Sequence, residues 1–147
     1  MGKVTRATAI VDAHVLLVRD AHVLLLKRQN TEFEDGKYCL IAGHLESGES
    51  IVHAAAREAF EEVGIRIPAE NLRFAHVIHN NSGGHRIGLF FLTEHWIGKP
   101  SNSEPVKCSS LEWFPIDKLP LEMIDYQREA VERMFQGSLF SIRGWRR

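Results

Sequence analysis

The stretch "AREAFEEVG", Ala56 to Gly64, places three glutamates within five residues of a segment otherwise rich in Ala, Phe and Val. It lies in a longer run, 51–63, that contains neither Pro nor Gly. Ser50 is a favoured N-cap residue in front of this run, and Gly64 fits the position just past a helix end. The pattern therefore predicts an α-helix over residues 51–63.

On that helix Glu58, Glu61 and Glu62 stand at positions i, i+3 and i+4, so they share one sector. Such a sector is commonly a solvated acidic face. This one also holds the small or apolar residues Ile51, Ala54 and Ala55, whereas the other side is expected to hold Val52, Ala56, Ala59, Phe60 and Val63. Crowded carboxylates repel one another, so we expect a cation among them, and clustered oxygen ligands suit Mg²⁺ or Mn²⁺.

The composition restricts the kinds of partner. The chain has 147 residues, is 44% hydrophobic and 25% charged, and carries a formal net charge of -1. These values fit one domain over 1–147 and provide no basic field for double-stranded nucleic acid. Cys39 and Cys108 have no metal-like spacing and make no disulfide framework. With no signal-type run and no stretch near the ~20 apolar residues of a membrane span, we expect a cytoplasmic protein without a membrane partner.

Strand-like segments surround the predicted helix. Residues 12–19 and 20–27 nearly repeat each other (DAHVLLVR and DAHVLLLK) and predict two adjacent strands joined by a tight turn. Further strands are expected at 38–43, 73–80, 85–98 and 111–116, with a hairpin turn at 80–84 and a second helix, closed by Gly137, over 125–137. Strands on both sides of a helix in one domain indicate an α/β or α+β sheet covered by helices.

The loop before the first helix favours phosphate chemistry. In "AGHLESGES", residues 42–50, Gly43 and Gly48 allow the backbone to approach a ligand closely. Glu49 lies just ahead of the helix N-terminus, where the helix dipole favours anions. Because Mg²⁺ usually binds a few carboxylates together with substrate phosphates, loop and helix together indicate a phosphate-bearing substrate.

Loop and helix match one longer pattern. The segment "GHLESGESIVHAAAREAFEEVG", residues 43–64, resembles the signature box of the Nudix hydrolases in its Gly, Arg and Glu positions. Seven fixed identities would fall together by chance on the order of once in a million such chains. The resemblance extends to "EPVKCSSLEWFPIDKLP", residues 104–120, and covers most of the chain. It departs at Ile41-Ala42, where Pro-Gly is common, and at the small Ala59; neither departure removes a ligand.

The resemblance implies a fold, a reaction and a metal site. The family fold is an α/β/α sandwich around a mixed sheet, and its members cleave nucleoside diphosphates linked to a further group. By resemblance, Glu58, Glu61 and Glu62 bind Mg²⁺ or Mn²⁺ together with the backbone carbonyl of Gly43. In the family the metals bridge phosphate oxygens and lower the pKa of the attacking water.

The remaining box residues have supporting or catalytic roles by the same resemblance. Arg57 and Glu49 hold the loop against the helix by pairing, and Gly64 closes the helix. The general base comes from a box glutamate, Glu58 or Glu61, or from an acidic residue in a later loop. Glu104 is the candidate in that loop. The alternative, with equal weight, is that Glu104 is only a solvated loop residue.

The substrate is less constrained than the reaction. Shortly past the box, where family members carry a Pro for ADP-ribose or a Tyr for diadenosine polyphosphates, this chain has Asn80, Asn81, Ser82 and Gly83. The Ser-Gln-Pro-Trp run of NADH cleavage is absent, and the Trp-Pro-Asp-Asp of the mammalian oxidised-purine enzyme has no match near 121–126. A canonical or oxidised nucleoside triphosphate, cleaved to monophosphate and pyrophosphate, is thus the leading small-molecule substrate. The alternative substrates are a nucleotide sugar and a dinucleotide. The alternative functions are a non-catalytic nucleotide-sensing module and a Nudix-related isomerase. A homodimer stays open, and no substrate-binding residue is predicted.

Histidines and tryptophans receive no firm role. The eight histidines are scattered, and His76 and His79 would point to opposite faces of a strand, so no zinc site is expected. His44 could contact phosphate or fill its loop. Trp96 and Trp113 could stack on a base or belong to the core or an interface.

Overall fold

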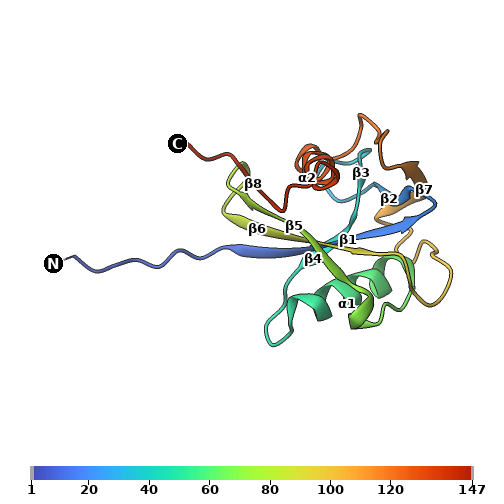
Figure 1. The fold of residues 1–147 in the computed structure, drawn as a ribbon, viewed down its shortest axis with the longest axis horizontal. Helices are drawn as coiled ribbons and strands as arrows, with labels where there is room; N and C mark the ends of the chain where they lie inside the picture. Colours follow the sequence, from blue (N-terminus) through green and yellow to red (C-terminus); the bar gives the residue numbers. More distant parts are fainter. Residues whose placement is uncertain (1, 147) are drawn as a thin grey trace.

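The computed structural model describes residues 2–146 and shows a central sheet with one helix on each side (Figure 1). The helices are α1 (Ile51–Val63) and α2 (Asp125–Phe135), with a short 3₁₀ turn at Ala69–Asn71. The strands are β1 (Ile10–Arg19), β2 (His22–Arg28), β3 (Tyr38–Cys39), β4 (Ile41–His44), β5 (Arg73–Asn80), β6 (Arg86–Thr93), β7 (Cys108–Pro115) and β8 (Phe140–Arg143).

Strand β1 connects two groups of strands. It pairs along its length with β4 (antiparallel) and β6 (parallel), and β5 continues this group between β6 (antiparallel) and β8 (parallel). At its end, β1 pairs with β2 through Val18 with Val23 and Arg19 with His22. The turn between them has positive φ at Asp20 and Ala21, as a two-residue type I′ turn requires. Strand β2 then pairs with β3 and β7. The mixed sheet and its two covering helices confirm the expected α/β/α sandwich.

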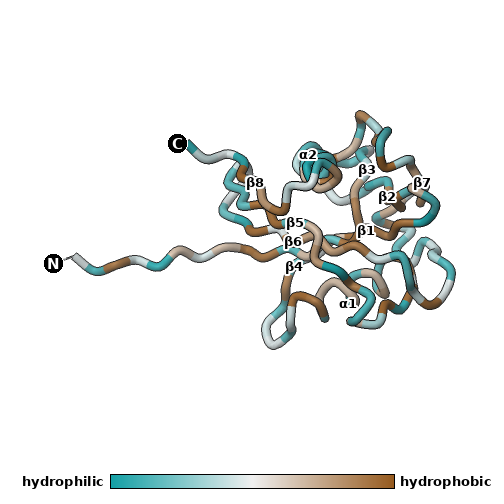
Figure 2. Tube along the Cα trace, in the orientation of Figure 1, coloured by the Kyte–Doolittle hydropathy of each residue, from teal (hydrophilic) through white to brown (hydrophobic). Residues whose placement is uncertain are grey.

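Alternation along β1 divides the core into two clusters. Ala13, Val15 and Leu17 pack with the buried side of α1, whereas Leu16 and Val18 pack with that of α2. Each large side chain buried in this way stabilises the fold by roughly 1.5–3 kcal/mol. In Figure 2 the central strands are mostly hydrophobic, while α2 is largely hydrophilic because it buries one narrow stripe.

Two sequence expectations need correction or addition. The strand expected at 85–98 ends at Thr93, and beyond it Ile97 makes an isolated bridge to Arg66. The short edge strand β8 was not expected at all. Helix α1, by contrast, has the expected bounds: Ser50 Oγ accepts a hydrogen bond from His53 N at 3.1 Å, and Gly64 closes the helix at φ 71°.

In the described part of the chain no helix is long and apolar enough to cross a membrane.

Candidate active site

Helix α1 packs its smallest residues and two of its three glutamates toward the sheet. Its buried stripe consists of Ala54, Ala55, Ala59 and Val63. Glu58 and Glu62 lie half-buried beside this stripe, and Glu61 is exposed. Phe60, which was expected on the side of the helix opposite the glutamates, is 51% exposed, and its ring lies 5.2 Å from the Arg66 guanidinium. The alanines let α1 approach the sheet closely, which leaves the large ring outside and brings the carboxylates in.

Strand β4 gives the Glu58 carboxylate its place. A Cβ atom added at Gly43 would lie 2.0 Å from the Glu58 Cδ and Oε1 atoms. The absence of a side chain at Gly43 therefore creates the space that Glu58 fills. The requirement concerns the position of this carboxylate more than the fold, because the end of a glutamate side chain can move.

Arg57 connects the loop to the helix. Its Nε and Nη2 atoms donate to the two carboxylate oxygens of Glu49, at 3.0 and 2.8 Å, and Nη2 also donates to the backbone oxygen of His44 at 3.0 Å. Its Nη1 atom donates to Glu58 Oε1 at 2.8 Å and to Glu61 Oε2 at 3.3 Å. The hydrogen bonds from Arg57 lower the pKa of Glu49 to about 2. One guanidinium thus donates hydrogen bonds to three carboxylates, those of Glu49, Glu58 and Glu61.

The hydrogen bond of the Glu62 carboxylate comes from the backbone and not from a cationic side chain. Its Oε2 accepts from the backbone N–H of Ala42 at 3.1 Å. Burial, followed by the charge of Glu58, raises the pKa of Glu62 well above its ordinary value. Burial also raises the pKa of Glu58, despite its contact with Arg57. Negative charge in this corner is therefore under-compensated by the side chains around it.

The loop that carries Glu104 is fastened to the end of α1. Ser101 N donates to Val63 O at 3.0 Å and Ser103 N donates to Glu62 O at 3.1 Å, so the loop satisfies carbonyls left free at the helix C-terminus. This attachment brings Glu104 near the acids of α1, where its charge contributes to raising the pKa of Glu58 and of Glu62. The sequence motif alone did not reveal this connection.

A second group of polar residues lies on the face of the sheet covered by α2, and the sequence analysis missed two of its members, Asp12 and Arg86. Asp12, 7% exposed, accepts a hydrogen bond from His44 Nδ1 at 2.7 Å and two from Arg86 Nη1 at 3.1 Å. Because Asp12 pairs with His44 in the sheet, these groups adjoin Gly43 directly. A charged residue within an apolar strand next to the box was the available signal. His44 thus contacts Asp12 in addition to closing its loop.

Deeper on the same side, His14 forms a neutral buried network. Its Nε2 lies 2.9 Å from the Tyr126 hydroxyl, its Nδ1 lies 3.2 Å from Leu89 O, and its ring stacks on Phe90 at 4.1 Å. Burial lowers the pKa of His14 to about 4 and raises that of Tyr126 to about 12. Both groups therefore stay uncharged near neutral pH.

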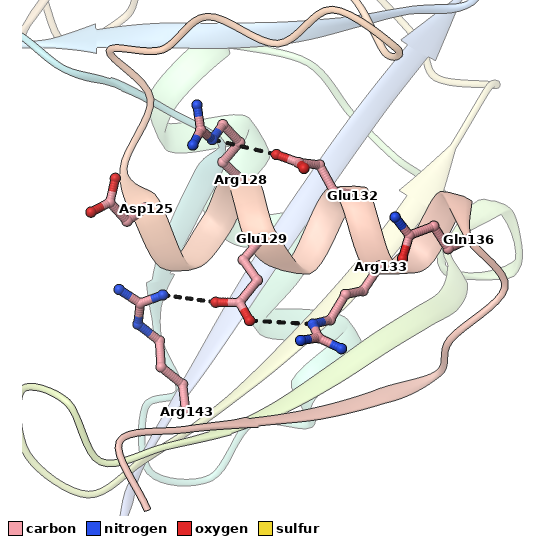
Figure 3. A pocket seen from close by; sticks show the side chains of 7 residues that line it. All are labelled: Asp125, Arg128, Glu129, Glu132, Arg133, Gln136 and Arg143. Carbon is pink, nitrogen blue, oxygen red and sulfur yellow. Dashed lines mark hydrogen bonds and ion pairs between the residues drawn. The ribbon is translucent and has the colours of Figure 1, made fainter.

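Other candidate residues lie elsewhere. Trp96 and Trp113 stack on each other at 6.2 Å, with the Arg19 guanidinium 4.7 Å from the Trp96 ring, at the opposite end of β1 from Asp12. A groove of about 500 Å³ on α2 is lined by charged residues, several of which are joined in ion pairs (Figure 3). Its lining residues are Asp125, Arg128, Glu129, Glu132, Arg133, Gln136 and Arg143.

The α1 corner has the donor chemistry that a magnesium or manganese ion requires. Glu58, Glu61 and Glu62 offer carboxylate oxygens and Gly43 a backbone carbonyl, all hard ligands. Within residues 2–146 no three His, Cys, Asp or Glu side chains already surround one point as metal ligands. Arg57 Nη1 instead lies between Glu58 and Glu61. The residues fit the ion chemically, provided that this one nitrogen gives up its two contacts.

Comparison with known proteins gives a consistent family. A sequence profile described as NUDIX domain matches residues 9–134. The chain is 35% identical over 113 residues to the NAD-capped RNA hydrolase NudC of Chromobacterium violaceum, covering 76% of this chain and 40% of that protein. It is 30% identical over 115 residues to the oxidized purine nucleoside triphosphate hydrolase of Danio rerio, covering 75% of this chain and 69% of the relative.

A solved structure shows the same architecture. The crystal structure of a MutT NUDIX hydrolase from Burkholderia pseudomallei superposes with a TM-score of 0.77 at 29% identity, over 86% of this chain and 98% of that one. The chain spans less than half the length of the NudC relative, whereas it spans most of the MutT protein.

Proposed function

The chain belongs to the Nudix hydrolase family, and from its site we propose that it hydrolyses the pyrophosphate linkage of a canonical or oxidised nucleoside triphosphate, giving monophosphate and pyrophosphate. The observation that carries this proposal is the group of acids on α1 beside Gly43, with fewer cationic contacts than carboxylates. A phosphate substrate with its divalent cation supplies the charge that this corner lacks.

The proposed metal ligands are Glu58, Glu61, Glu62 and the carbonyl of Gly43. A bound Mg²⁺ or Mn²⁺ would polarise the phosphate and activate water. Arg57 holds Glu49 through two nitrogens and meets Glu58 and Glu61 through the third. Releasing Nη1 alone therefore frees the ligands while the loop stays attached to the helix.

Glu104 is our proposed general base, with Glu58 or Glu61 as the alternative. The support is its loop, which the last turn of α1 holds through Ser101 and Ser103. A glutamate within reach of the attacked phosphorus can accept the proton of the water, and its own charge stays balanced by the bound cation.

We place the rest of the nucleotide on the α2 side of β4. Asp12, His44 and Arg86 form a linked polar group adjoining Gly43, which offers both donors and acceptors to a sugar or base. A nucleoside triphosphate is favoured because the similarity to the oxidised purine enzyme and to MutT extends over most of those proteins. The similarity to NudC favours a dinucleotide-linked substrate as the second candidate.

A substrate screen tests the proposal. Canonical and oxidised nucleoside triphosphates, ADP-ribose, NADH and nucleotide sugars are incubated with Mg²⁺ or Mn²⁺, and kcat/KM is measured from the released products. We expect the highest kcat/KM for a triphosphate, with monophosphate and pyrophosphate as products. A higher value for ADP-ribose or NADH would contradict the substrate class, and no turnover of any compound would contradict the hydrolase itself.

A further inference from the structure

A pair of histidines lies near the β5 end of the strand order, away from the α1 acids. His79 is on β5 and His85 precedes β6, and the turn between them brings their Nε2 atoms to 2.8 Å. His79 is three strands from β4 in the order β4–β1–β6–β5, which separates it from Gly43 by about 14 Å or more. Neither histidine has a part in the proposed hydrolysis.

The hydrogen bonds define which ring nitrogen carries a proton. His85 Nδ1 lies 2.8 Å from the Thr8 carbonyl oxygen. A carbonyl can only accept, so Nδ1 of His85 is the protonated nitrogen and its Nε2 presents a lone pair in the neutral ring. His79 Nε2 then donates to that lone pair. His85 therefore has an arrangement typical of metal-binding histidines, in which one ring N–H is held by a backbone carbonyl and the other nitrogen presents a lone pair.

We propose that His79 and His85 form a binding site for a divalent transition-metal ion of the Cu²⁺ or Ni²⁺ class, separate from the magnesium site. When the proton of His79 moves from Nε2 to Nδ1 and the two rings turn slightly, both Nε2 lone pairs can face one metal ion. With metal–nitrogen bonds of about 2.0–2.1 Å, nitrogens 2.8 Å apart subtend an angle of about 85–90° at the metal. Such an angle fits square-planar or octahedral ions better than tetrahedral Zn²⁺, and imidazole nitrogen disfavours Mg²⁺.

The surroundings allow a cation to enter. Both histidines are only half-buried. Two neighbouring arginines are engaged with carboxylates. Arg86, which follows His85, donates from Nη1 to Asp12 at 3.1 Å, and Arg143, which pairs with Asn80 in the sheet, donates from Nη1 to Glu129 at 2.7 Å. Their positive charges are therefore partly compensated, which reduces the repulsion that an incoming cation meets.

The chain ends hold the pair in place. The Trp145 ring lies over His79 at a centroid distance of 4.5 Å, and its Nε1 donates to His79 O at 3.0 Å. A Cβ atom added at Gly144 would lie 2.6 Å from Ser82 N, so the C-terminal segment fits tightly against the turn. Thr8 contacts His85 from the N-terminal side. A metal here would link three segments that are distant in sequence and should raise thermal stability.

Calorimetric titration of the untagged chain with CuCl₂ or NiCl₂ at neutral pH tests the proposal. The variants are His79→Gln and His85→Gln, and His22→Gln is the matched control because His22 is also a half-buried histidine at a strand end, whose Nδ1 contacts Asp20 O. Wild type and control should bind one equivalent with the same affinity. Each test variant should bind more than about tenfold more weakly, because the loss of even an outer contact to a metal site costs that much.

Electron paramagnetic resonance of the wild type with one equivalent of Cu²⁺ gives a readout that needs no variant. Two equatorial imidazole nitrogens are expected, and Cu²⁺ should also quench the fluorescence of the adjacent Trp145, so Trp145→Phe should reduce the quenching. Equal Cu²⁺ affinity in wild type and both test variants would overturn the proposal. So would a spectrum with fewer than two nitrogens.

Discussion

The two helices carry the same number of acidic residues in very different surroundings. On α2, Glu129 is paired with Arg133 and Arg143, and Glu132 with Arg128. On α1, a single arginine, Arg57, contacts four carboxylates of the loop and helix, and the pKa of Glu62 is raised because its carboxylate is buried.

The difference shows that the number of acids on a helix does not identify a metal site. Exposed pairs such as those of α2 contribute about 0–1 kcal/mol each and leave little charge for a ligand to neutralise. The carboxylates of α1 are held close together by the packing of alanines and by Gly43, so they repel one another until a cation binds. The wide groove on α2 is, on this account, a structural surface.

The largest expected effect concerns the proposed base. If Glu104 accepts the proton of the attacking water, Glu104→Gln should lower kcat by roughly 10²–10⁴-fold while leaving Mg²⁺ affinity nearly unchanged. Glu94→Gln is the control, since Glu94 lies in an exposed loop with a loose contact to Arg73. Steady-state kinetics at saturating Mg²⁺ measures both. Near-normal turnover of Glu104→Gln would return Glu104 to the role of a solvated loop residue.

The neutral network under α2 should make stability pH-dependent. His14 has a folded pKa of about 4, below its unfolded value of 6.5. Between pH 6.5 and pH 4 the unfolded chain is protonated at His14 while the folded chain is not, so the free energy of unfolding decreases as the pH falls. Relative to His14→Gln, the wild type should lose about 3 kcal/mol of unfolding free energy between pH 7 and pH 4. Denaturant unfolding at both pH values measures this, and parallel curves for the two proteins would contradict it.

A side chain added at Gly43 should have a smaller effect on turnover than the loss of the proposed base. In Gly43→Ala the new Cβ must displace the Glu58 carboxylate, so we expect turnover to fall by about tenfold, or 1.4 kcal/mol, with thermal stability close to that of the wild type. Gly83→Ala is a suitable control because its Cβ would meet nothing within 4 Å. Unchanged turnover would mean that the position of Glu58 is unimportant for the reaction.

The smallest effect is expected on α2. Glu129→Gln weakens contacts to Arg133 and Arg143 on a partly exposed surface, so the unfolding free energy should fall by less than about 1 kcal/mol and turnover should stay at the wild-type level. A loss of activity as large as that expected on α1 would remove the distinction between the two helices.

Much of this arrangement could be predicted from sequence because it depends on local patterns. Helix α1, its caps and the clustering of Glu58, Glu61 and Glu62 follow from spacing along 50–64. The edge strand β8 could not be predicted, since four residues near the chain end acquire strand structure only by pairing with β5. Helical periodicity places Phe60 opposite the glutamates but does not say which stripe meets the sheet, so the exposure of this ring could not be predicted.

The rest of the candidate site depends on contacts between distant segments. Asp12 and Arg86 are 74 residues apart and become neighbours through the parallel pairing of β1 with β6. The approach of Glu104 to α1 depends on backbone hydrogen bonds from Ser101 and Ser103, which any residue type except proline could make. Side-chain identity therefore carries little information about the approach of Glu104.

The most direct test of the central claim is thermal melting with and without Mg²⁺ for the wild type, Glu62→Gln and Glu129→Gln. If the α1 acids exist to hold a divalent cation, Mg²⁺ should raise the Tm of the wild type and of Glu129→Gln equally. Glu62→Gln should melt at or slightly above the wild-type temperature without metal, because one repelling carboxylate is gone, and should gain clearly less on adding Mg²⁺. An identical Mg²⁺ response in all three proteins would contradict the assignment of the metal site to α1.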